Sequence, residues 1–229
     1  LIAIGKKSGV DHFLILSIVG VESNYGRHKG TYSVFNALYT QIARMPRRSK
    51  WAKKEMIEYL LYCYKDKIPP HSILGSYAGA FGYGQFIPSS YNAYAIDGND
   101  DGVRKPYDWS DVFASIGNYL IKNGYPQTDP SNQEKVYKSV YAYNHADNYV
   151  KAVIDKINRV KNLFQNVTSM LEYNQIPYQL FNLDKDSYVD TFKLHQDIPR
   201  YSSDGLFTSL PEKYMSKVKG WVEDYLCSQ

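Results

Sequence analysis

A single carboxylate ends an apolar run near the start of the chain. Glu22 follows the sequence LILSIVGV at residues 14–21. A helix that is apolar on nearly all sides is a buried helix, and a carboxylate in its last turn is disfavoured by desolvation and by the negative end of the helix dipole. Both effects raise the pKa of the carboxyl, which favours a general acid near neutral pH. The alternative is a solvated glutamate at a fraying helix end.

A glycine-rich stretch, residues 73–90 (ILGSYAGAFGYGQFIPSS), is the second feature that favours a functional role. Its small residues argue against regular structure throughout and favour close approach of the backbone to a ligand or to a neighbouring element. Loops of this kind on a helical scaffold often carry function. A tight loop with a purely structural role is the alternative.

Residues 97–108 (DGNDDGVRKPYD) match the template of a twelve-residue calcium-binding loop. Gly102 stands at position six, where the loop makes a sharp turn. Aspartate stands at position twelve in place of the usual glutamate, so we expect weaker binding or binding through one oxygen. The alternative is a turn rich in Asp and Asn without an ion. The expected ligands fall at positions one, three, five, seven and twelve: Asp97, Asn99, Asp101, the backbone carbonyl of Val103, and Asp108.

Helical periodicity dominates the chain, and no convincing set of strands appears, so the fold class is mainly α. We expect Asp11 or Ser8 to cap the first helix, Gly26 to end it, and Pro46 to break the pattern after the second. From about residue 166 the composition changes, which divides the chain into a domain over residues 1–165 and a C-terminal extension, 166–229, that packs on or beside it. The predicted helices cover residues 8–24, 34–43, 49–65, 89–95, 110–123, 136–144, a segment from 147 onward, and 212–226.

The composition excludes few classes of protein, but the net charge indicates which kinds of binding partner to expect. The net charge of +4 does not indicate a nucleic-acid partner and is compatible with an anionic polymer. The clearest basic run, residues 44–54, is interpreted as a solvated face, with a binding patch as the less favoured alternative. No stretch reaches the roughly 18 apolar residues of a membrane span. Cys63 and Cys227 would allow one bridge, although a buried free thiol is the default for Cys63.

Four separated motifs together resemble a known family. They are GVESNYGR (residues 20–27), GSYAGAFGYGQFIPSSY (75–91), the calcium-type loop followed by IGNYL (116–120), and AYNHADNYVKAV (142–153). Their order and spacing resemble the membrane-bound lytic transglycosylase B family, lysozyme-like enzymes that act on peptidoglycan. The resemblance covers about residues 1–160. It implies a helical lysozyme-superfamily domain with a glycan cleft, an EF-hand-like loop with structural Ca²⁺, and no organic cofactor.

The same resemblance implies a location and a set of roles. It points to a periplasmic, secreted or cell-envelope protein, acting as a monomer on peptidoglycan glycan strands. The family's sole catalytic acid/base falls on Glu22. The substrate-binding positions that it implies are Ser76, Phe81 and Gln85 in the glycine-rich loop, the cleft tyrosine Tyr119, and the pair Tyr143 and Asn144, which faces the carboxylate.

One carboxylate is enough if the substrate supplies the nucleophile. Glycosidases generally use two carboxylates, and Asp147, the other acid within these motifs, is better placed as a helix cap. Glu22 would protonate the β-1,4 glycosidic oxygen between MurNAc and GlcNAc. As a carboxylate, it would then accept the proton of the muramoyl 6-hydroxyl as that oxygen attacks the anomeric carbon, which gives a 1,6-anhydro sugar.

Three departures from the family pattern leave alternatives open. Phe81 stands where the family usually has Met, Gly84 where Pro is common, and Ala146 where Ser is frequent. The first alternative is a lysozyme-type muramidase that hydrolyses the same bond, including on N-deacetylated peptidoglycan. The second is a non-catalytic glycan-binding module.

Overall fold

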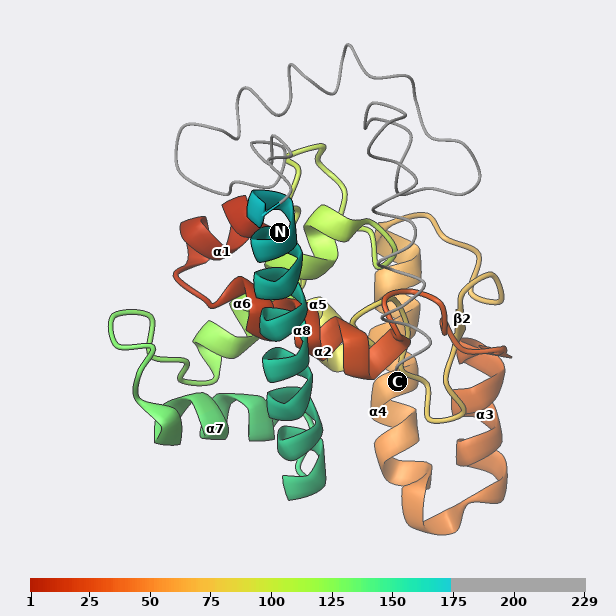
Figure 1. Ribbon diagram of the computed structural model, residues 1–229. Helices are drawn as coiled ribbons and strands as arrows, with labels where there is room; N and C mark the ends of the chain where they lie inside the picture. The colour runs from red at the N-terminus through yellow and green to blue at the C-terminus, as the bar shows by residue number, and fades with distance from the viewer. Residues whose placement is uncertain (174–229) are drawn as a thin grey trace. The chain divides into compact units, whose positions relative to one another are not determined.

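Helices make up nearly all of the regular structure, as the sequence predicts (Figure 1). The computed structural model describes residues 1–173, with side chains up to residue 166. Contacts group Leu1–Lys161 into one unit. In chain order the elements are α1 (Ile2–Ser8), α2 (His12–Ser23), β1 (Tyr32–Ser33), α3 (Val34–Arg44), α4 (Pro46–Lys65), β2 (Leu74–Gly75), α5 (Pro88–Tyr94), α6 (Trp109–Lys122), α7 (Gln133–Tyr143) and α8 (Asp147–Tyr173).

The central helix, α2, carries Glu22 in its last turn. Asp11 closes its first turn, because the carboxylate accepts a hydrogen bond from the Phe13 amide at 2.8 Å. Ile15 and Ile18 are fully buried, and burial of each such side chain stabilises the fold by about 1.5–3 kcal/mol. The predicted buried helix is therefore confirmed, and Asp11 is its cap.

Three element boundaries differ from the sequence prediction. The helix expected over residues 8–24 begins only at His12, because a separate helix that the sequence did not predict, α1, ends before Gly9, which takes a left-handed conformation with φ 69°. The pattern breaks before Pro46 as expected, but α4 begins at Pro46 rather than at residue 49, since a proline in the first turn removes no helical hydrogen bond. The sequence does not predict β1 and β2, which pair antiparallel with Tyr32 opposite Gly75.

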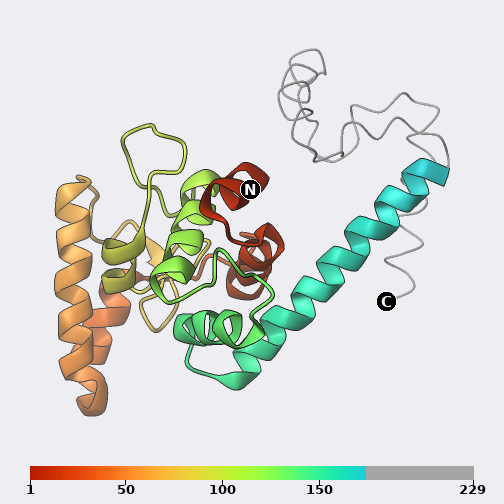
Figure 2. The ribbon, with the colours of Figure 1, turned by 90° about the vertical axis from the view of Figure 1, so that its left-hand side faces the viewer.

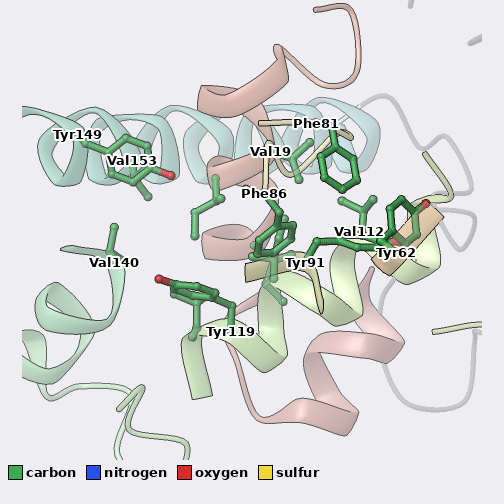
Figure 3. Close-up of a cluster of buried hydrophobic side chains, with 14 of the residues drawn as sticks. Val19, Tyr62, Phe81, Phe86, Tyr91, Val112, Tyr119, Val140, Tyr149 and Val153 are labelled. Atoms are coloured by element: carbon green, nitrogen blue, oxygen red, sulfur yellow. The ribbon is translucent and has the colours of Figure 1, made fainter. Parts of the chain in front are cut away.

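Aromatic side chains form much of the core, which Figure 3 shows between the helices. The ring of Phe81 lies 5.6 Å from that of Tyr62 and 5.0 Å from that of Tyr91, centroid to centroid. All three side chains are buried. The Tyr91 hydroxyl donates a hydrogen bond to the Arg104 carbonyl at 2.8 Å, so a polar tip that is out of water keeps a partner. Part of the chain's high tyrosine content therefore serves packing.

The last of the described residues form a single long helix, α8. α8 runs without a break across residue 165, and the predicted division into two domains at that point stays a prediction. The helix expected over residues 212–226 and Cys227 lie outside the described residues, while Cys63 is buried. In the part of the chain that the structure covers, no helix is both long enough and apolar enough to cross a membrane.

Replacing the cap of α2 tests how firmly the helix is fixed. We expect Asp11→Ala to lower the free energy of unfolding by about 1 kcal/mol, because the Phe13 amide loses its acceptor. The same carboxylate pairs with Lys161 at 2.9 Å, and this partly exposed pair adds a few tenths of a kcal/mol at most. Urea unfolding measures the change. The matched control is Asp155→Ala, an exposed site in α8, which we expect to shift the value by less than about 0.5 kcal/mol. Equal effects of the two substitutions would contradict the capping role.

Candidate active site

The end of α2 presents Glu22 at the edge of the core. Glu22 is the penultimate residue of the helix and is half-buried. The helix ends abruptly because the next residues, Asn24 (φ 47°), Tyr25 (φ 56°) and Gly26 (φ 80°), all have left-handed backbones. The Ser23 hydroxyl holds this turn, since it donates to the Val19 carbonyl at 3.2 Å and accepts from the Gly26 amide at 3.0 Å. The carboxyl group is therefore presented by a fixed backbone.

The surroundings of Glu22 favour its protonated form. Burial raises the pKa of the carboxyl from its ordinary 4.5 to about 7, and interaction with the Tyr149 hydroxyl offsets only part of that rise. The Tyr149 hydroxyl is itself buried and has no hydrogen bond of good geometry. Burial raises its pKa, and the neighbouring carboxyl raises it further. A carboxyl with a pKa near 7 can both donate and accept a proton at neutral pH.

Tyr143 links the end of α7 to the glycine-rich loop. Its hydroxyl donates to the Gly84 carbonyl at 2.7 Å. Its ring lies 4.7 Å from that of Tyr119 and 5.4 Å from that of Phe86, and it is parallel to the Tyr149 ring at 6.4 Å. Burial raises the pKa of Tyr143 well above 10, and the charge of the Glu22 carboxylate raises it further. The structure therefore brings Glu22, Tyr143 and Tyr149 into one electrostatic group.

The glycine-rich loop is a tight turn held by its own polar groups. The Ser76 hydroxyl accepts hydrogen bonds from the amides of Ala78 (3.2 Å) and Ala80 (3.1 Å). Gln85 has a left-handed backbone with φ 48°, and its Nε2 donates to the Gly82 carbonyl at 2.8 Å. Ser76 and Gln85 are both half-buried, so each is tied to the loop while part of it faces solvent.

Two expected sugar-binding residues lie in the core instead. Phe81 is 0% exposed, so the expectation that its side chain contacts substrate is wrong: the ring packs against both Tyr62 and Tyr91, in the core that Figure 3 shows. Tyr119 is 9% exposed, and its hydroxyl donates to the Ala142 carbonyl at 2.7 Å. Tyr119 therefore supports the ring of Tyr143 from within.

Asn144, the second residue of the predicted pair, lies at the surface. Gly84 and Ala146, which depart from the family pattern, are buried and half-buried. Asn144 is exposed and takes an extended conformation directly after α7, beside the half-buried Tyr143. Gly84 is buried, and a Cβ added there would lie 3.2 Å from the Tyr143 hydroxyl oxygen. Ala146 is half-buried, and its amide donates to the Asn144 carbonyl at 2.7 Å.

The predicted calcium loop is closed by hydrogen bonds that its own backbone amides donate to its side-chain oxygens. Asp97 accepts from the amides of Asp101 at 3.1 Å and Gly102 at 2.6 Å, and the side-chain carbonyl of Asn99 accepts from Asp101 at 3.1 Å. The Lys105 ammonium pairs with Asp101. In the described part of the chain, no group of three or more His, Cys, Asp or Glu side chains is arranged to hold a metal ion.

The end of this loop is fixed by Asp111 rather than by Asp108. The Asp108 carboxylate caps α6 by accepting from the amides of Ser110 (2.9 Å) and Asp111 (3.3 Å). The Asp111 carboxylate is buried and accepts from the amides of Gly98 (2.8 Å) and Lys105 (2.7 Å), the second and ninth residues of the loop. Asp111 therefore joins the loop to α6.

Sequence reasoning missed the roles of Tyr149 and Asp111. Tyr149 stands five residues after Asn144 and one before Val150, on the buried side of α8. An aromatic residue with a polar tip on an apolar helical face was the available signal for the first. Asp111, in the first turn of an apolar helix, offered no sign of its burial.

The other carboxylates near these motifs have different tasks. Glu55 is 5% exposed, and its oxygens accept from the Ser89 amide and the Ser89 hydroxyl, each at 2.9 Å. Asp147 is exposed and accepts from the Tyr137 hydroxyl. Within residues 1–166, Glu22 is the carboxyl whose pKa is clearly raised. A one-carboxylate site is the arrangement that these geometries favour.

Comparisons with known proteins show which sequences and structures this chain is similar to. Residues 1–136 match the family model of the transglycosylase SLT domain. Over 121 residues the chain is 38% identical to membrane-bound lytic murein transglycosylase B of Escherichia coli, a match that covers 53% of this chain and 34% of the relative. The chain thus spans about a third of that relative's length.

Solved structures show the same similarity. The soluble lytic transglycosylase SltB1 of Pseudomonas aeruginosa superposes with a TM-score of 0.64 at 26% identity, over 70% of this chain and 74% of the other. The Escherichia coli lytic transglycosylase Slt35 in complex with calcium superposes with a TM-score of 0.66 at 25% identity, over 70% and 69% of the two chains.

The raised pKa of Glu22 predicts a pH-dependent stability. Because the folded-state pKa of about 7 lies above the ordinary 4.5, folding favours the proton. The contribution is fully present below about pH 4.5, is lost as the pH rises to about 7, and amounts to roughly 3 kcal/mol at most. We expect the unfolding free energy of Glu22→Gln, measured in urea, to lack this decline. The exposed control Glu134→Gln should keep it, and parallel profiles for the parent and Glu22→Gln would contradict the buried acid.

Proposed function

Because the chain belongs to the transglycosylase SLT domain family, we propose that it cleaves the β-1,4 bond between MurNAc and GlcNAc of peptidoglycan by lytic transglycosylation. Family membership confirms the resemblance read from the four motifs, and the mainly helical fold agrees with it. The observation that carries the proposal is Glu22, the carboxyl within residues 1–166 whose pKa is clearly raised, to about 7, beside the half-buried Tyr143 and the buried Tyr149.

Glu22 acts first as the general acid. In its protonated form it donates to the glycosidic oxygen as the bond to the anomeric carbon breaks, and the leaving sugar departs with that proton. Burial holds the proton on the carboxyl up to about pH 7. The bond cleavage leaves positive charge near the anomeric carbon and a Glu22 carboxylate close to it.

The carboxylate then acts as the general base. It takes the proton of the muramoyl 6-hydroxyl while that oxygen attacks the anomeric carbon, which closes the 1,6-anhydro ring and restores the protonated Glu22. The hydrogen of the Tyr143 hydroxyl is committed to the Gly84 carbonyl. The hydroxyl oxygen therefore offers its lone pairs, which stabilise developing positive charge.

The glycine-rich loop and the end of α7 supply the binding surface in this proposal. Ser76 and Gln85 are half-buried, and each is held by hydrogen bonds to its own loop. Asn144 is exposed beside Tyr143. Side chains that are fixed before substrate arrives lose little entropy on binding. The partner is a peptidoglycan glycan strand, and the place of action is the cell envelope.

A structural Ca²⁺ in the loop of residues 97–108 is part of the proposal. The donor set consists of oxygen atoms, as Ca²⁺ prefers. Gly102 has φ 86° with no atom within 4 Å of an added Cβ, which fits the sharp turn. Asp97, Asn99, Asp101 and the Val103 carbonyl would hold the ion, with Asp108 available through the oxygen that does not cap α6. The ion would fix the loop ahead of α6.

Product analysis tests the proposed reaction. We expect digestion of purified sacculi to give muropeptides with 1,6-anhydro ends by mass spectrometry, with no ¹⁸O incorporated from labelled water. Glu22→Gln should lower the rate by about 10²–10⁴-fold because it removes the proton donor. The matched control is Asp147→Asn, an exposed acid of the same motifs, which should retain the parent rate. Reducing ends carrying ¹⁸O would establish a muramidase instead. Sacculus binding without release of fragments would establish a binding module.

Calcium binding has its own test. We expect Ca²⁺ to raise the melting temperature by several degrees at about 100-fold excess over the dissociation constant, and EDTA to reverse the rise. Lys105→Ala should tighten binding, because the ammonium that competes for Asp101 is gone. Lys7→Ala, an exposed lysine on α1, serves as the control. An unchanged melting temperature in every arm would contradict an ion site.

A further inference from the structure

One side of α4 faces solvent along most of its length. Its exposed residues recur at spacings of three and four, which places them on a single stripe of the helix. The stripe extends over about 21 Å at the helical rise of 1.5 Å per residue. We call these residues the outer stripe: Lys50, Lys53, Lys54, Ile57, Leu60, Leu61 and Tyr64.

The opposite side of α4 packs into the core of the domain. Ala52, Met56, Tyr59 and Cys63 are buried there, and the neighbours of α4 are α3 and α5. Figure 2 shows α4 at the outer edge of this unit, with its other side turned away from the remaining helices. The outer stripe is therefore not covered by another helix of the described residues.

The apolar half of the outer stripe is strongly exposed. The exposed fractions are 59% for Ile57, 38% for Leu60, 45% for Leu61 and 84% for Tyr64. Single exposed apolar residues are ordinary, but four of them contiguous on one helix mark an interaction site. A partner surface that removes these four side chains from water would bind more tightly, because burial of apolar area is favourable.

The other half of the outer stripe is basic, and no exposed acid interrupts it in the described part of α4. Glu55 is buried against Ser89, and the Glu58 carboxylate accepts from the Asn92 amide group at 2.8 Å. Lys65 adds an exposed positive charge beyond the apolar half. A partner that suits this surface combines negative charge with an apolar layer.

We propose that the outer stripe docks the protein on an anionic lipid surface. A bilayer with acidic headgroups offers phosphates and an apolar layer a few ångströms beneath them. The lysines would meet the phosphates, while Ile57, Leu60 and Leu61 would enter the boundary of the acyl chains. Tyr64 would lie at the headgroup level, where tyrosine is enriched. This inference concerns α4 alone and does not depend on the proposed reaction.

A second copy of this chain fits the outer stripe less well. Parallel pairing of two stripes would set lysines against lysines, and full antiparallel pairing would set lysines against leucines. Only the C-terminal halves could meet apolar to apolar, over roughly 10 Å of helix. Such a contact would bring together four apolar side chains from each copy, whereas a stable interface takes roughly 20–30 residues a side.

Vesicle binding tests the docking surface with the full chain. We expect the protein to sediment with vesicles of phosphatidylglycerol and phosphatidylethanolamine, and not with phosphatidylcholine alone, with binding that falls as salt rises. Lys53→Glu with Lys54→Glu should lower the partition coefficient at least about tenfold. Leu60→Gln with Leu61→Gln should do the same without changing the salt dependence.

Matched variants keep the result specific. Lys7→Glu with Lys151→Glu makes the same change of net charge on exposed residues outside α4, and Leu74→Gln removes an exposed leucine elsewhere. Both should bind vesicles like the parent, with unchanged melting temperatures in all variants. The proposal is overturned if the parent does not bind anionic vesicles, if the controls weaken binding equally, or if the α4 variants alter only self-association in sedimentation velocity.

Discussion

The chemistry of the site depends on the desolvation of one carboxyl group, at the end of a buried helix. Desolvation holds the proton on Glu22 up to about pH 7, and an ordinary glutamate would have lost it near 4.5. The apolar packing of α2, in which Ile15 and Ile18 are fully buried, offsets the free-energy cost of this desolvation. The same burial that lowers stability at neutral pH produces a group able to give and then take a proton. Stability and chemistry are thus opposed at one residue.

The second element of the site is a layer of aromatic rings that holds the groups around Glu22. Tyr143 is anchored at both ends, by its hydroxyl on Gly84 and by its ring against Tyr119 and Phe86. This places the glycine-rich loop and the end of α7 in fixed relation, although they are some 60 residues apart in sequence. Tyrosine suits the task because one side chain supplies both apolar area and a directional hydrogen bond.

The sequence predicted what depends on local pattern, and it was less informative where burial decides. The apolar run around Glu22 identified the buried helix and its carboxyl, and Asp11 was one of two expected caps. Phe81 was misplaced because a glycine-rich loop gives no sign of which side chain turns into the core. Its ring meets Tyr62 of α4 and Tyr91 of α5. Asp111 was overlooked because its partners are backbone amides, which leave no mark in the sequence.

The pKa of the Glu22 carboxyl can be measured directly. Side-chain carboxyl carbons of glutamate, labelled with ¹³C, are followed by NMR across the pH range, and the Glu22 signal is assigned by its absence in Glu22→Gln. Burial of the carboxyl predicts a titration midpoint of about 7 for this signal. A midpoint near the ordinary 4.5 would contradict it, because the carboxyl would then be ionised at neutral pH and could not begin the reaction as an acid.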